Sequence, residues 1–219
     1  MDGGSCMEPV YFLLLSIGFF LLSLIGYKKF KSITLYSLAI GGLVNSNYYH
    51  SMQYPINCFG LTLGIDSIIY VLFVFCVVVM YFKEGKKAAI SLSISSILAI
   101  VVAATMQLCA DLISDGSSLR EWNTFFTFLS SAFASVVSVF VLVKIFDKIK
   151  VNDYLKLVIC IFIVAFVNSI IYYPLYILIN GWTSEFANII VGNVIGKFVA
   201  IFTSLIPFFF MNKMDKKIK

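Results

Sequence analysis

Residues 33–88 read ITLYSLAIGGLVNSNYYHSMQYPINCFGLTLGIDSIIYVLFVFCVVVMYFKEGKKA, and this stretch decides the fold. Two apolar runs, 33–50 and 63–82, flank a polar hairpin. Amide and carboxylate groups at membrane depth are costly unless they face a cavity or one another, so they are candidates for a functional site. The polar and glycine residues of the hairpin and its edges are Asn45, Asn47, His50, Gln53, Asn57, Gly60, Gly64 and Asp66.

The composition excludes an ordinary soluble domain. Of the 219 residues, 61% are hydrophobic and 12% are charged, whereas a soluble domain is about half apolar and about a quarter charged. An apolar span needs roughly 20 residues to cross a bilayer. The chain therefore has room for six or seven helices, and we predict a single membrane domain over residues 1–219.

We predict an all-α, polytopic membrane helix bundle with six core helices and one N-terminal helix. The residues before the first apolar run, MDGGSCMEP, are acidic. A secretory signal needs a basic segment there, so the first run is expected to be a retained helix. The predicted spans are 10–27, 33–50, 63–82, 88–112, 124–146, 155–179 and 188–211.

The positions of the basic residues predict the orientation. With the N-terminus outside, the clusters within 28–31, 83–87, 144–156 and 213–219 all lie inside, and they hold 14 of the 16 Lys and Arg residues. Basic residues concentrate in cytoplasmic loops. If the weakly hydrophobic span 33–50 did not cross, the basic cluster 83–87 would lie outside the cell, so the charge pattern supports this span. We therefore expect seven crossings of the cell membrane and a cytoplasmic C-terminus, and the net charge of +5 does not indicate nucleic-acid binding.

Lys197 lies inside the seventh span, roughly 12 Å from its outer end. Two placements fit the sequence. The side chain can extend along the helix toward the headgroups, or it can join Asn193 and Ser204 in a polar stripe that faces the bundle interior. We favour the interior placement.

Other polar residues lie within the predicted spans. Asn45 and Asn47 are in the second span, Gln107 is in the fourth and Asn168 is in the sixth. A single amide of this kind commonly bonds one helix to another, but together with Lys197 these amides indicate a shared cavity. Asp66 either faces that cavity or stabilises the first turn of its helix through the helix dipole.

The chain lacks the motifs of an enzyme. It contains no Ser-His-Asp order, P-loop, HExxH or paired carboxylates. Its five cysteines have no CxxC spacing, and it has one histidine. We therefore expect no enzymatic activity, no metal site and no cofactor.

Several short motifs resemble those of one transporter family. They are Asn47 followed by Thr62-Leu63-Gly64, then Gly85-Lys86-Lys87-Ala88, then FVNSIIYY at 166–173, and finally GKFVAIFTSLIPFFF at 196–210. In these features the chain resembles the vitamin-uptake-like family, also called the queuosine precursor transporter family. It is a divergent member by this resemblance, because CVVVMYFKEG at 76–85 lacks the family's intramembrane carboxylate. Ser138 and Asn168 likewise stand where many members have acids.

The resemblance implies uptake of a small planar heterocycle, a 7-deazaguanine-type base, across the lipid bilayer. The expected substrate-binding residues are Asn45, Asn47, Asp66, Gln107, Ser138, Asn168, Asn193 and Lys197. Two alternatives remain open: a substrate-binding subunit of a multi-component vitamin importer, and a non-transporting structural or immunity-type membrane protein. Energising subunits and a homodimer are also left open, and no nucleic-acid partner is expected.

Overall fold

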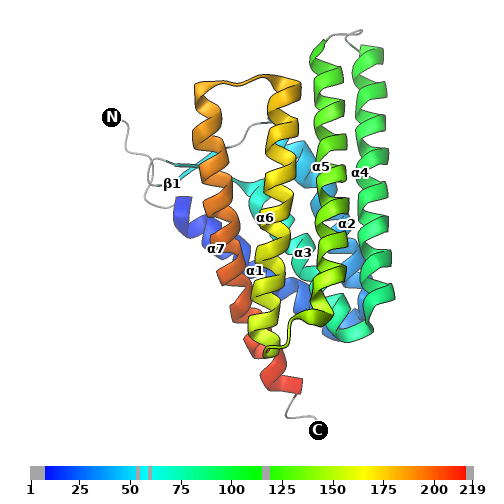
Figure 1. The fold of residues 1–219 in the computed structure, drawn as a ribbon, viewed down its shortest axis with the longest axis vertical. Coiled ribbons are helices and arrows are strands. Elements are labelled where there is room, and N and C mark those ends of the chain that lie inside the picture. The colour runs from blue at the N-terminus through cyan, green and yellow to red at the C-terminus, as the bar shows by residue number, and fades with distance from the viewer. Residues whose placement is uncertain (1–7, 53–54, 59–60, 115–118, 216–219) are drawn as a thin grey trace.

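The computed structural model describes the backbone of residues 8–52, 55–58, 61–114 and 119–215. It describes the side chains of residues 10–45, 64–113, 122–183 and 187–209. Within these ranges the chain forms seven α-helices, one 3-10 turn and a two-stranded hairpin (Figure 1). The elements are α1 (Glu8–Phe30), α2 (Ser32–Met52), β1 (Pro55–Cys58), β2 (Leu61–Gly64), α3 (Ile65–Glu84), α4 (Lys86–Ser114), α5 (Leu119–Ile145), η1 (Phe146–Lys148), α6 (Asp153–Asn180) and α7 (Ser184–Asp215).

The predicted polytopic helix bundle is confirmed. Helices α1, α3, α4, α5, α6 and α7 are each long and apolar enough to cross a membrane. Helix α2 has a shorter apolar segment, Ser32–Asn45. Its 21 residues nevertheless extend roughly 31 Å. That α2 makes a seventh crossing therefore stays a prediction.

The predicted polar hairpin between the second and third spans contains a short antiparallel β-hairpin. Pro55 lies opposite Gly64, and Cys58 lies opposite Leu61. Gly64 has extended backbone angles and is the N-cap residue of α3. The helix therefore begins at Ile65 and not at Leu63, where the predicted span begins.

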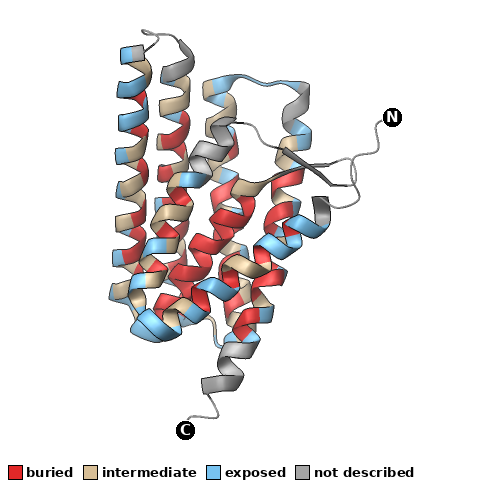
Figure 2. Ribbon diagram, turned by 180° about the vertical axis from the view of Figure 1, so that it is seen from behind, coloured by how far each residue is buried: buried red, intermediate tan, exposed pale blue. Residues whose placement is uncertain are grey.

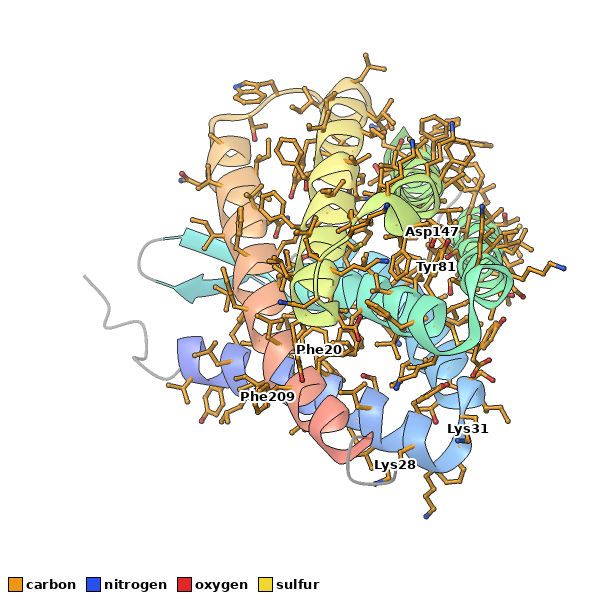
Figure 3. All side chains as sticks on the ribbon, turned by 60° about the horizontal axis from the view of Figure 1, so that its bottom comes forward. Phe20, Lys28, Lys31, Tyr81, Asp147 and Phe209 are labelled. Carbon is orange, nitrogen blue, oxygen red and sulfur yellow. The ribbon has the colours of Figure 1, made fainter. Side chains whose placement is uncertain are left out.

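Successive helices run in alternating directions (Figure 1). As a result, the α1–α2, α3–α4 and α5–α6 connections and the C-terminal part of α7 gather at one end of the bundle, here called the lysine-rich end. Figure 3, which brings this end forward, places Lys28 and Lys31 there together with Tyr81 and Asp147. The opposite end carries β1 and β2 and is called the hairpin end.

Helix α3 is the core of the bundle. Every residue from Ser67 to Tyr81 is buried, as Figure 2 shows by the continuous red of its middle turns. A helix that is apolar on all sides lies in a protein core or in lipid, and α3 lies in the protein core. Helices α1, α2, α4, α6 and α7 pack around α3. By contrast, α4 exposes an apolar stripe, Ile94, Leu98 and Val102, as a lipid-facing helix does.

An aromatic cluster ties the connections together at the lysine-rich end. The ring of Tyr81 stacks on Phe146 of η1 at 3.9 Å between centroids. The Tyr81 hydroxyl donates to Asp147 Oδ2 at 3.1 Å. Lys156 Nζ lies 4.1 Å from the centroid of the Phe146 ring. These contacts hold the α5–α6 connection against the last turn of α3.

The crossing by α2 can be tested by labelling single cysteines in intact cells. Two single-cysteine variants are compared: one keeps Cys58 alone, and the other carries Lys29→Cys in a cysteine-free background. If α2 crosses the membrane, Cys58 and the cysteine introduced at residue 29 should react with an impermeant maleimide from opposite sides. This follows because α2 separates the two residues. Thr183→Cys, in the α6–α7 connection, should react from the side of Cys58. Lys86→Cys should react from the side of residue 29. Reaction of Cys58 and residue 29 from one side would exclude the seventh crossing.

Candidate functional site

The candidate site lies where α7 approaches α3 closely. Gly192, Gly196 and Ala200 are buried on α7 and share a face with Lys197 and Asn193. A Cβ atom built at Gly196 would lie 3.2 Å from the Cβ atom of Ser67 on α3. Small residues of this kind let two helix backbones approach one another. This close approach brings Lys197 toward the centre of the bundle.

Lys197 is buried, with 8% of its surface exposed. Its Nζ donates to Ser169 Oγ at 2.8 Å and to Asn168 Oδ1 at 3.3 Å, both on α6. The same nitrogen lies 4.9 Å from the centroid of the Tyr70 ring and 5.7 Å from that of Tyr173. A cation at this depth needs such hydrogen bonds and aromatic faces in place of water. The side chain therefore follows the interior placement, not the path toward the headgroups.

The hydroxyl network fixes where each proton points. Ser169 donates its own proton to the Ala165 carbonyl at 2.9 Å, so its oxygen is free to accept from Lys197. Ser138 likewise donates to the Ser135 carbonyl at 3.0 Å. The hydroxyl of Tyr70, 3.1 Å from Ser138 Oγ, is therefore the donor in that pair. These bonds link α7 to α6 through Lys197 and Ser169, and α3 to α5 through Tyr70 and Ser138.

One buried hydroxyl of this region has no hydrogen-bond partner. Among the described residues, Ser135 Oγ on α5 is the buried side-chain oxygen that makes no hydrogen bond. Ser135 and Ser138 are both fully buried. An unpaired buried hydroxyl marks a position where a water molecule or a ligand can supply the missing bond.

Asn193 forms a second polar centre, one helical turn from Lys197. Its Oδ1 accepts from the Gly64 backbone N–H at 3.2 Å and from Ser67 Oγ at 3.1 Å. Its side chain also hydrogen-bonds the hydroxyl of Tyr173. Asn193 thus joins α7 to the start of α3 and to the end of the β-hairpin.

Asp66 brings a negative charge to the same region. It is half-buried in the first turn of α3. It is near enough to interact electrostatically with Lys197 and with Tyr172 and Tyr173. Its position also suits the dipole at the start of α3. Both roles considered for Asp66 are therefore compatible with its place in the fold.

Of the eight residues predicted to bind substrate, five lie in one region of the structure: Asp66, Ser138, Asn168, Asn193 and Lys197. Two others lie elsewhere. Asn45 is exposed and donates to the Gly41 carbonyl of its own helix at 2.8 Å. Gln107 is exposed near the end of α4 and donates to Asp111 Oδ1 at 2.7 Å. The side chain of Asn47 lies outside the described residues.

Sequence reasoning did not select the aromatic and hydroxyl partners of the lysine. Tyr70, Tyr173 and Ser169 complete the site. A signal for two of them was present, because Asn168, Ser169 and Tyr173 follow one another within NSIIYY on α6. Among the described residues, no three His, Cys, Asp or Glu side chains group as metal ligands.

A groove of about 410 Å³ runs between α6 and α7 and reaches this cluster. Ser169, Tyr173 and Lys197 line it together with apolar side chains. Several of the apolar side chains are exposed on the lipid-facing surface: Phe162, Phe166, Ile170 and Phe198.

Comparison with protein-family models, with curated proteins and with solved structures found no match to this chain. The resemblance to the queuosine precursor transporters therefore remains a proposal.

The link made by Asn193 can be tested through stability. Asn193→Ala removes the acceptor for the Gly64 N–H and one acceptor for Ser67. Ser67 keeps the Asn193 backbone carbonyl as an acceptor, but the part-buried Gly64 N–H is left unpaired, which should lower the free energy of unfolding by about 1–3 kcal/mol. Denaturant titration in detergent measures this. Asn45→Ala is the matched control, since among the described residues that exposed amide bonds the Gly41 carbonyl of its own helix; it should change stability by less than about 0.5 kcal/mol. Equal effects of the two substitutions would contradict the assigned link.

Proposed function

We propose that the protein is a membrane carrier for a small planar ligand and that Lys197 is the central ligand contact. The observation that carries the proposal is the burial of the Lys197 ammonium between two tyrosine rings in a membrane bundle. Ionisable groups at this depth are costly and are typical of substrate paths. Apolar side chains would pack the same helices at no such cost.

The chemistry of the cluster favours binding over catalysis. Its groups are one ammonium, two amides, several hydroxyls and one carboxylate. These groups recognise hydrogen-bonding edges and ring faces. A nucleophile activated by a neighbouring base would be needed for covalent catalysis.

A 7-deazaguanine-type base suits these groups. Its carbonyl oxygen would accept from Lys197, its amide edge would pair with Asn168, and its ring would stack on Tyr70 or Tyr173. Aromatic side chains favour such stacked contacts. The resemblance to queuosine precursor transporters points to the same ligand class, although no acid stands at the positions of Ser138 and Asn168.

The carrier proposal predicts a specific loss in Lys197→Met. The protein should still fold, because a buried charge is replaced by an apolar chain of similar length. Uptake of radiolabelled 7-deazaguanine into proteoliposomes should fall at least about tenfold, which corresponds to one lost charge-assisted hydrogen bond. The control is Lys144→Met, since Lys144 is exposed and lies over the Phe140 ring, outside the cluster. Its uptake should be unchanged.

Transport by Lys197→Met at the wild-type rate would refute the role of Lys197. Binding of 7-deazaguanine without uptake by the purified protein, together with uptake in cells that supply further subunits, would instead identify the substrate-binding subunit of an importer.

The same proposal predicts facilitated transport without proton coupling. Proton-coupled carriers commonly use an intramembrane acid within reach of the substrate. The positions of the family's acids here hold Ser138 and Asn168. Uptake should therefore stop when the internal and external concentrations are equal. Accumulation above the external concentration that a protonophore abolishes would contradict this and would point to Asp66 or His50.

A further inference from the structure

The groove between α6 and α7 opens toward the lipid. Its wall contains Phe166 and Ile170, whose side chains are more than half exposed, at 59% and 56%. Both residues belong to the apolar part of a membrane-spanning helix. A molecule dissolved in the bilayer can therefore reach the groove without passing through water.

The groove has the shape of a channel for a chain. On α6 it extends from Phe162 to Pro174, twelve residues apart, which is roughly 18 Å along the helix. Phe162 and Phe166 stack at one end, and Phe198 of α7 packs against Phe162 at 5.2 Å between centroids. A flexible apolar chain can follow such a wall.

The inner wall of the groove carries a cation. An ammonium has three N–H donors. Among the described residues, Asn168 Oδ1 and Ser169 Oγ accept two of them. The contacts of Lys197 are otherwise the two neutral tyrosine rings, while Asp66 adds an electrostatic interaction. One N–H donor of Lys197 therefore has no acceptor among the described residues and can donate to a ligand.

From the apolar wall and the ammonium of Lys197 at its inner side we infer that the groove binds a long-chain monocarboxylate, such as a free fatty acid, that enters from the bilayer. The acyl chain lies between Phe162 and Pro174, and the carboxylate accepts a hydrogen bond from Lys197. Charge complementarity favours a carboxylate over a neutral lipid chain, because only the carboxylate can accept the remaining N–H of Lys197 and add negative charge to that of Asp66. This ligand shares Lys197 with the proposed carrier site, so the two ligands exclude each other.

The test uses photolabelling of the purified full-length protein in phosphatidylcholine nanodiscs. The probes are a diazirine-bearing palmitic acid and its methyl ester, at concentrations below saturation. The acid should label the groove residues of α6 and α7 about tenfold more than the ester, because a charge-assisted hydrogen bond corresponds to at least a tenfold difference in affinity. Peptide mapping locates the adducts.

Two variants separate the contribution of charge from that of shape. Lys197→Met should remove the difference between acid and ester while retaining a folded protein. Ile170→Trp fills the groove and should reduce labelling by both probes. Leu98→Trp is its matched control, because Leu98 is an exposed lipid-facing residue on α4. It should leave labelling unchanged.

Equal labelling by acid and ester in the wild-type protein would overturn the inference and identify an ordinary lipid-contact surface. So would an undiminished preference for the acid in Lys197→Met. Photolabelling is read without transport, so its failure is distinct from failure of the carrier proposal. If both ligands bind, palmitic acid should inhibit 7-deazaguanine uptake in wild-type protein but not in Ile170→Trp.

Discussion

The apolar circumference of α3 is the constraint on which the rest of the bundle depends. From Ile68 to Met80 the helix is apolar except for the hydroxyl of Tyr70, and each of these residues is buried. A helix of this kind is covered either by protein or by lipid, and α3 is covered by the five helices that pack around it. The helices that pack around it then expose their outer apolar faces, such as the stripe on α4, which only a bilayer covers without cost.

Burial of α3 also explains how polar groups come together at its hairpin end. Ser67 and Tyr70 are oriented toward the helices that surround α3, so their hydroxyls must bond across helix boundaries. Ser67 bonds Asn193 on α7, and Tyr70 bonds Ser138 on α5. Lys197 fits between Tyr70 and Tyr173 because Gly196, its neighbour, lets α7 approach α3. The candidate site is thus a consequence of close helix packing around one buried helix.

The helix bundle was predictable because each helix is marked by a run of largely apolar residues, about 20 in most of them, and by lysines at or beside one of its ends. The predicted spans correspond to the seven helices, and the polar spacing on α7 favoured the interior position of Lys197. The rotation of each helix about its own axis, which decides the side chains that face the bundle interior, was less predictable. Asn45 and Gln107 look like site residues by depth, yet each bonds a neighbour four residues away on its own helix. Tyr70 gave no signal, because a tyrosine in an apolar run resembles any other core aromatic residue until its partner on another helix is known.

Lys197 is held inside the bundle by its hydrogen bonds to Asn168 and Ser169 of α6. A double-mutant cycle on Lys197 and Ser169 tests this contact most directly. Lys197→Met, Ser169→Ala and the double variant would be unfolded with denaturant in detergent. If Nζ donates to Ser169 Oγ, the free-energy changes should be non-additive, with a coupling energy of about 0.5–3 kcal/mol. Additivity within about 0.3 kcal/mol would show that the two side chains do not interact, and it would contradict the account.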